Sequence, residues 1–306
     1  MRIISLLPSA TEMIADLGLA DSLVGISHAC DYPAEIKHLP RVTSCNVPKD
    51  ASSIEIDHFV RSELQNQNAL YILDIDQIRS LNPDLIISQA LCDVCAVDGR
   101  DVEKALSNLP EHVQLINFEP FTLDDVLNTL LILGEATARE DLAKNLYEDC
   151  QARIQKVRER QHGARPSMVL LDWVDPPFIS GHWMRDLIQF AGADSCFDLN
   201  EKPSFSCDWD ALIQAKPDHL AIACCGFDMK RTLNEILTSN VYFQLDILNS
   251  NGTKIHLFDG NQLFSRASLR LVDSLELLAH SLFPKRHPFT LPRGVDIPVG
   301  QLPWQK

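Results

Sequence analysis

The feature that most constrains the fold is residues 122–163, a long stretch from which helix-breaking residues are almost absent. Pro120 and Pro166 lie just outside it, and Gly134 is its only glycine before Gly163. Apolar residues recur through it at spacings of three and four, which predicts two helices that meet at a weak point after Gly134. The second helix, with about 24 residues at 1.5 Å per residue, would be about 36 Å long.

A helix of that length in the middle of the chain favours a brace between two lobes. The alternative is an ordinary crossover helix that packs on a single sheet. The chain has 306 residues, enough for two cores of ordinary domain size. We therefore expect an N-terminal α/β lobe at residues 1–121, a helical linker at 122–163, a C-terminal α/β lobe at 164–284 and an irregular, proline-rich tail at 285–306.

Each predicted lobe contains the same short pattern. Residues 76–84 and 210–218 both begin and end with aspartate, have proline before the last aspartate and precede a short apolar run. Short apolar runs that alternate with helical segments predict an α/β fold with mostly parallel sheets, here two Rossmann-like lobes joined by one long, rigid helix. Ligands of such sheets bind at the carboxyl ends of the strands, so we expect functional residues in the loops there.

Charge and hydropathy argue against several classes of protein. The net charge of −15 argues against nucleic acid or an anionic membrane surface as the main partner, because both require a basic surface. No run of residues approaches the roughly 18 apolar residues of a membrane span. We therefore expect no membrane insertion.

The N-terminus and the cysteines favour a cytoplasmic protein. The first apolar run is short and is followed by Pro8 and Glu12, so we interpret it as a buried strand and not as a signal peptide. The nine cysteines form an odd and unevenly spaced set, which suits reduced thiols in the cytoplasm. The alternative is that a leader has been removed and that the protein works in the periplasm.

Several motifs occur in a fixed order along the chain: SLLPSATE at residues 5–12, the mid-chain helix, Gly-His-Trp at 181–183 and the two strands that follow Pro-Asp. Together they span about residues 2–283. Their combination resembles the class III periplasmic binding proteins, and within them the vitamin B12 (cobalamin) binding type that feeds an ABC importer. The resemblance implies two lobes joined by a rigid helix, a ligand clamped in the cleft between them with little closure, and an ABC permease as partner.

Two loop motifs resemble a leaderless branch of the same family, which is usually labelled cobalamin-binding by similarity. They are SHACDYP at residues 27–33 and QALCDVCAV at 89–97. We expect the chain to differ from secreted members, which carry a leader, and it departs from the leaderless pattern at Ala29, where that pattern has glutamate. A corrinoid-handling protein is the alternative partner to a permease.

Cys92 and Cys95 form a Cys-x-x-Cys pair, and His28 and Cys30 lie on another loop of the same predicted lobe. If the two loops converge, three thiolates and an imidazole suit a tetrahedral zinc site, and iron is a further candidate. Two alternatives stay open. The cysteines could form a redox-active pair, or they could be small residues that pack a turn or the wall of the ligand site.

Aromatic residues gather in the loops expected at the ligand site, where they suit a large, flat, partly apolar ligand such as a corrin or a porphyrin. The alternative for each of them is the core. His182 is a candidate axial ligand to cobalt or iron, and its alternative is a helix-entry residue bonded to the backbone. The residues expected to bind the ligand are Tyr32, Trp173, Phe178, His182, Trp183 and Phe227.

Asp76 and Asp210 occupy the same position in the two repeated patterns, just before a predicted helix. Aspartate at such a position is a natural helix N-cap, so we expect both residues to cap. The resemblance implies a second role, because importer-linked members present one acidic residue from each lobe to arginines of the permease.

The leading hypothesis is a cytoplasmic protein, not an enzyme, that binds cobalamin, another corrinoid or a related tetrapyrrole. The sequence has no Gly-rich phosphate loop, no Gly-x-Ser-x-Gly elbow and no His-Glu-x-x-His motif. The rival hypothesis is a metal- or thiol-dependent enzyme on the same scaffold. Its centre would be Cys30, Cys92 and Cys95, with His28 beside them.

Overall fold

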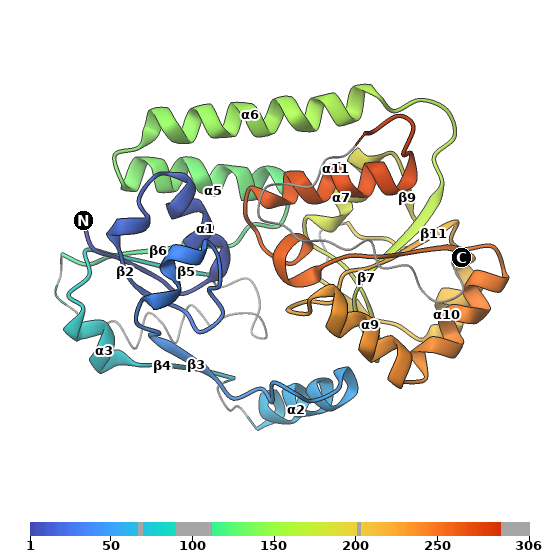
Figure 1. Ribbon diagram of the computed structural model, residues 1–306, viewed down its shortest axis with the longest axis horizontal. Helices are drawn as coiled ribbons and strands as arrows, with labels where there is room; N and C mark the ends of the chain where they lie inside the picture. Colours follow the sequence, from blue (N-terminus) through green and yellow to red (C-terminus); the bar gives the residue numbers. More distant parts are fainter. Residues whose placement is uncertain (67–69, 90–109, 111, 201–202, 289–306) are drawn as a thin grey trace. The chain divides into compact units, whose positions relative to one another are not determined.

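The computed structural model describes residues 1–66, 70–89, 110, 112–200 and 203–288 (Figure 1). The chain forms two compact units. The first consists of Met1–Ala51, Glu55–Pro120 and Asp125–Tyr147, and the second of Ser52–Ile54, Phe121–Asp124 and Glu148–Lys306. Among the described residues, none of the helices combines the length and the apolar character needed to cross a membrane.

The first unit is built on a four-stranded parallel sheet with the strand order β2-β1-β5-β6. Ile4 pairs with Ile86 in its centre, and both side chains are fully buried. The central strands of the sheet are mostly apolar and buried, because a central strand of a parallel sheet is covered on both faces. The strands are β1 (Ile3–Ser5), β2 (Leu23–Ile26), β5 (Leu85–Gln89) and β6 (Gln114–Phe118).

Short helices and a separate antiparallel strand pair also belong to the described part of the first unit. The pair joins β3 (Thr43–Cys45) to β4 (Tyr71–Leu73). Pro8 opens the first helix, where its missing N–H group costs nothing. The helices are α1 (Pro8–Asp16), η1 (Ala20–Ser22), η2 (Ala34–His38), α2 (Ser53–Gln65), whose first two residues belong to the second unit, and α3 (Ile75–Ser80).

The stretch 122–163 forms two helices, α5 (Leu123–Ala136) and α6 (Glu140–Glu159), which lie side by side in opposite directions (Figure 1). The turn between them includes Ala138, whose φ is +52°. Gly134 is needed for their close approach, because a Cβ atom at this position would lie 2.4 Å from the Cβ of Ala143. The weak point expected after Gly134 is therefore where the chain reverses.

The second unit has a mixed six-stranded sheet with the main order β10-β8-β7-β11-β12 and with β9 beside β7. Its strands β7, β9, β11 and β12 are parallel, whereas β8 and β10 are antiparallel to their neighbours. The bounds are β7 (Ser167–Val174), β8 (Pro177–Ile179), β9 (Asp194–Ser195), β10 (Phe205–Ser206), β11 (His219–Ile222) and β12 (Lys254–Leu257).

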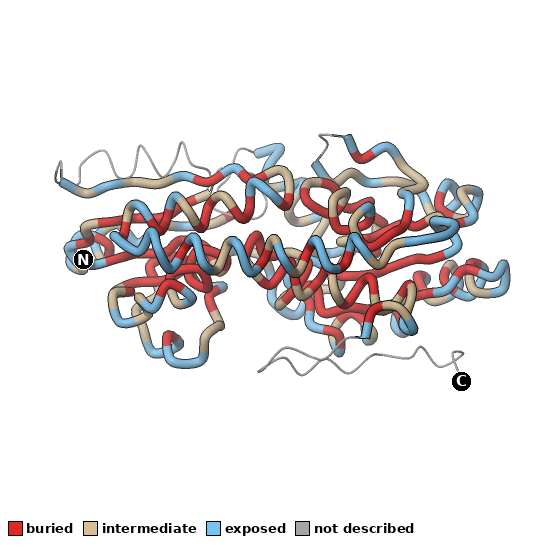
Figure 2. The backbone as a smooth tube through the Cα atoms, turned by 90° about the horizontal axis from the view of Figure 1, so that it is seen from above, coloured by how far each residue is buried: buried red, intermediate tan, exposed pale blue. Residues whose placement is uncertain are grey.

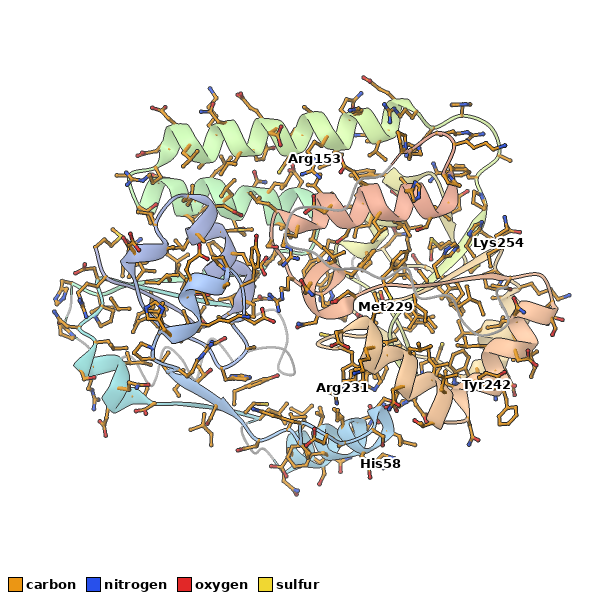
Figure 3. All side chains as sticks on the ribbon, in the orientation of Figure 1. His58, Arg153, Met229, Arg231, Tyr242 and Lys254 are labelled. Carbon is orange, nitrogen blue, oxygen red and sulfur yellow. The ribbon has the colours of Figure 1, made fainter. Side chains whose placement is uncertain are left out.

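Helices cover this sheet, and Figure 2 shows buried residues concentrated in the strands and on one side of the helices. Arg153 of α6 donates hydrogen bonds to Asp273 and Glu276 of α11, which joins the two helices by a partly buried ion-pair network (Figure 3). The helices are α7 (Met184–Ala191), α8 (Trp209–Ala215), α9 (Met229–Thr238), α10 (Val241–Ser250), the π-helical turn η3 (Gly260–Phe264) and α11 (Arg270–Leu282).

Two histidines form a stacked, hydrogen-bonded pair on neighbouring strands. Nδ1 of His219 on β11 lies 2.8 Å from Nε2 of His256 on β12, and the rings are nearly parallel, with centroids 5.1 Å apart. Burial, together with the positive charge of the nearby Lys254 ammonium, lowers the pKa of each imidazole to about 4. Both rings are therefore neutral near pH 7.

We expect Gly134→Ala to destabilise the protein by about 1–3 kcal/mol, because the added methyl group meets a methyl group and not a flexible chain end. Intrinsic helix propensity alone would give the opposite sign, a gain of about 1 kcal/mol. Urea denaturation measures the difference. The double variant Gly134→Ala/Ala143→Gly should be more stable than the sum of the two single effects predicts, because the two methyl groups no longer meet. A Gly134→Ala protein with a higher free energy of unfolding would contradict the contact.

We expect the free energy of unfolding to fall as the pH is lowered from about 6.5 to about 4. In that range the unfolded chain takes up protons that the native His219 and His256 do not, so the native state loses roughly 3 kcal/mol for one such imidazole. Well above the unfolded pKa of about 6.5 neither state is protonated, and this contribution is constant. Urea denaturation at several pH values should give a shallower slope for His219→Gln/His256→Gln, whereas an unchanged slope would contradict the assignment.

Candidate ligand-binding site

The carboxyl ends of the parallel strands β7, β11 and β12 lie at one edge of the second sheet, because the three strands run in the same direction. Trp173 lies next to the end of β7, residues 223–227 follow β11, and residues 258–261 follow β12. Loops from distant parts of the sequence thus bring aromatic and polar side chains to this edge.

Trp173, Phe227 and Arg231 form a stack at this edge. The rings of Trp173 and Phe227 are tilted with centroids 4.9 Å apart, and Cζ of Arg231 lies 3.7 Å from the centroid of the Phe227 ring. Figure 3 shows Arg231 on α9, which begins next to Phe227. Phe227 is buried, whereas Trp173 is partly exposed. The arrangement holds a cation against an aromatic face and leaves part of an indole accessible.

Phe178 lies directly opposite Trp173, on the hairpin formed by β7 and β8, and is also partly exposed. Opposite residues of an antiparallel pair point to the same face of a sheet, apart from the local irregularity between Leu171 and Trp173. The structure therefore brings together three of the six residues expected to bind the ligand: Trp173, Phe178 and Phe227.

Trp183 has a different place. Its side chain is 6% exposed, and its indole N–H donates to the carbonyl oxygen of Phe264 at 2.9 Å. A buried indole with a satisfied N–H group packs the unit and has little area left for a ligand. The sequence could not distinguish it from Trp173, since both are tryptophans close to the end of a strand.

His182 precedes α7 with a φ of +52°, and its ring lies 4.8 Å from that of Phe121 and 5.8 Å from that of Trp183. Burial lowers the pKa of His182, so the imidazole is neutral near pH 7. Among the described residues, its Nε2 atom is shielded from water and has no hydrogen-bond partner. The alternative role of His182, a helix-entry residue hydrogen-bonded to the backbone, is thus not supported by a hydrogen bond at Nε2 among the described residues.

Asp172 lies beneath the aromatic residues, at the irregularity of β7. Burial raises the pKa of Asp172 to about 6. Its carboxyl group accepts a hydrogen bond from Ser204, and Ser204 Oγ in turn accepts from the N–H of Gly181 at 3.1 Å. This network fixes the chain just before His182.

A polar group that sequence reasoning missed follows β12. Arg266 is 6% exposed and donates to Oδ1 of Asn261 at 3.0 Å, while the N–H of Asn261 donates to the carbonyl oxygen of Phe227 at 3.0 Å. The available signal was Arg266 itself, a charged residue in a mostly apolar segment soon after a strand-end loop. Gly260 permits the close packing, because a Cβ atom there would lie 2.1 Å from the carbonyl oxygen of Cys224.

Tyr32 belongs to the first unit and is partly buried on the loop after β2. The role expected for it stays a prediction.

The expected metal ligands are described only in part. His28 Nδ1 lies 2.7 Å from Oγ1 of Thr43, and its ring stacks on Tyr71. The thiol of Cys30 is buried 3.1 Å from the hydroxyls of Thr11 and Ser27. Burial raises the pKa of Cys30, which favours the thiol over the thiolate that zinc requires.

Cys92 and Cys95 lie outside the described residues. Within the part of the chain that the structure describes, no three His, Cys, Asp or Glu side chains are grouped as a metal site requires. The four-residue metal site stays a prediction.

The expectation that Asp76 and Asp210 cap helices was wrong. Asp74 is the N-cap of α3, with its carboxylate accepting from the N–H of Gln77 at 2.9 Å, and Asp208 occupies the N-cap position of α8. Each helix begins two residues earlier than the repeated pattern indicates, and only the residue that directly precedes the first helical residue can act as the N-cap.

Asp76 and Asp210 instead lie in the first turns of α3 and α8, where a carboxylate still interacts favourably with the helix dipole. Both are exposed, and Asp76 is 3.5 Å from Arg79 in a surface ion pair. Their expected role in docking a partner stays a prediction.

Comparison with known proteins now places the chain. Residues 3–246 match the model of the family described as periplasmic binding protein. A vitamin B12-binding protein of Vibrio cholerae is 25% identical over 206 residues, which are 66% of this chain and 63% of that relative. The chain thus spans somewhat less than two thirds of the length of this relative.

Solved structures agree in fold. A periplasmic heme binding protein from Pseudomonas aeruginosa has a TM-score of 0.70 at 18% identity and covers 94% of this chain and 95% of its own. The periplasmic vitamin B12 binding protein of Vibrio cholerae has a TM-score of 0.65 at 20% identity and covers 92% and 96%.

These matches confirm the resemblance and the two-lobe α/β fold class expected from the sequence. The relatives are named as binding proteins and not as enzymes, in agreement with the expectation that the chain is not an enzyme. With most of its length matched by the family model, the chain belongs to the periplasmic binding proteins.

Proposed function

We propose that this protein binds a corrinoid such as cobalamin, or a related tetrapyrrole, and delivers it to a partner protein. The observation that carries the proposal is the stack of Trp173, Phe227 and Arg231 at the carboxyl edge of the second sheet. The Vibrio cholerae relative is a vitamin B12-binding protein, and the Pseudomonas aeruginosa structure is of a heme binding protein.

The aromatic residues account for affinity in this proposal. Trp173 and Phe178 are partly exposed on neighbouring strands, so a flat macrocycle can bury their remaining surface with little loss of side-chain entropy. Arg231 supplies a cation, already oriented by Phe227, for an acidic or amide substituent at the edge of the ligand. The location of the ligand in a cleft between the two lobes stays a prediction.

His182 is the proposed axial ligand. A neutral imidazole is the form that coordinates a metal ion. Nε2 has no hydrogen-bond partner to displace among the described residues, but it is shielded from water, so the proposal requires the ring to turn toward the ligand when it binds. Coordination would be to the cobalt or iron that the ligand carries. Zinc or iron held by the predicted cysteine site would be a separate binding event.

The partner and the compartment are further proposals. A small-molecule binding protein of this family would hand its ligand to an ABC permease, and the exposed Asp76 and Asp210 are the residues proposed to dock it. A cytoplasmic location would favour a corrinoid-handling protein instead. Cell fractionation with sequencing of the mature N-terminus distinguishes the two compartments.

We expect titration with hydroxocobalamin or hemin to quench tryptophan fluorescence to saturation at one ligand per chain. Trp173→Ala should weaken binding about tenfold or more, because it removes the exposed ring. His182→Ala should abolish any shift of the ligand's absorbance bands that accompanies binding.

Trp183→Phe is the matched control for Trp173→Ala. It should lower the melting temperature, since the hydrogen bond to Phe264 is lost, and leave the dissociation constant close to that of the unaltered protein. Absence of saturable binding of both hydroxocobalamin and hemin would refute the proposed function. Equal affinity of Trp173→Ala and the unaltered protein would refute the site.

A further inference from the structure

A buried carboxylate of α9 binds the start of another helix. Glu235 is 7% exposed, and its Oε1 atom accepts hydrogen bonds from Ser53 N at 2.8 Å and from Ser53 Oγ at 2.6 Å. Ser53 is the first residue of α2 and is completely buried. A carboxylate suits this position, because the first N–H groups of a helix lack partners and carry a partial positive charge.

The same serine contacts the ligand site. The indole N–H of Trp173 donates to the carbonyl oxygen of Ser53 at 3.2 Å. A continuous series of contacts therefore runs from Glu235 through Ser53 to Trp173, and from Trp173 to the Phe227 ring. Glu235 itself lies one turn beyond Arg231 on α9.

Residues 52–54 are an unusual part of the second unit. The residues on either side of them, Met1–Ala51 and Glu55–Pro120, belong to the first unit. Residues 52–54 thus enter the second unit as a short segment, which we call the strap. The bonds from Glu235 and Trp173 both end on Ser53, its central residue.

We propose that Glu235 is a positioning residue of the ligand site, which holds the strap against the edge of Trp173 and so fixes the ring on which a flat ligand stacks. The inference rests on the proposed function. Because the Ser53 carbonyl oxygen accepts the hydrogen bond of the indole N–H, the edge of Trp173 is held in place and its face stays available to the ligand.

The test compares Glu235→Ala, Glu235→Gln and Ser53→Ala with the unaltered protein. Hydroxocobalamin and hemin are the probes, and their dissociation constants and dissociation rates are measured by fluorescence quenching. Glu235→Ala should accelerate dissociation about tenfold, because the strap and the indole lose their fixed position. Glu235→Gln should recover part of this loss, since its amide oxygen still accepts hydrogen bonds but is uncharged.

Ser53→Ala should have a smaller effect than Glu235→Ala, because its N–H group still donates to Glu235. The matched control is Asp74→Ala, which removes a carboxylate that caps α3 in the first unit. It should lower the melting temperature and leave ligand dissociation unchanged. If Glu235→Ala behaves like this control, Glu235 has a structural role only and the inference is overturned.

A ligand-free measurement separates this inference from the proposed function. In Glu235→Ala the emission of Trp173 should shift to longer wavelength as water reaches the indole, and the shift should disappear in Glu235→Ala/Trp173→Phe. If the unaltered protein binds neither probe, the proposed function fails, while the emission still decides whether Glu235 positions Trp173. An unchanged emission in Glu235→Ala would overturn the positioning role.

Discussion

The parallel pairing of β7, β11 and β12 is the constraint on which the candidate site depends. Met168 pairs with His219, and His219 pairs with Lys254, so the three strands begin in register and end at the same edge. Trp173 and Phe227, and likewise Phe227 and Asn261, are distant in sequence but adjacent there because backbone hydrogen bonds align the strands that precede them.

Contacts between individual side chains and backbone groups then set the orientation of the aromatic rings at this edge. Phe227 contacts both the ring of Trp173 and the guanidinium of Arg231, and its carbonyl oxygen accepts a hydrogen bond from the N–H of Asn261. Trp173 is fixed in turn by Ser53. Such contacts add little to stability individually, but they restrict the rotamers of the aromatic rings, and a preorganised site loses less entropy when it binds.

The sequence predicted best what depends on neighbours along the chain. The two helices of residues 122–163 follow from apolar spacing and from the position of Gly134, and the short buried strands follow from apolar runs. The caps were misplaced because the choice between Asp74 and Asp76 depends on where the backbone turns, and both residues are aspartate. Because the two residues are identical, the amino-acid type does not indicate which of them directly precedes the first turn of α3.

The sequence by itself determined the α/β class and the family. Only the tertiary structure decided that Trp183 is buried while Trp173 stays partly exposed, and that Glu235 binds a serine 182 positions away. Helix and strand periodicity reports which face of an element is apolar, since it arises from local geometry. It does not report which distant backbone group meets a given side chain, because long-range packing sets that contact.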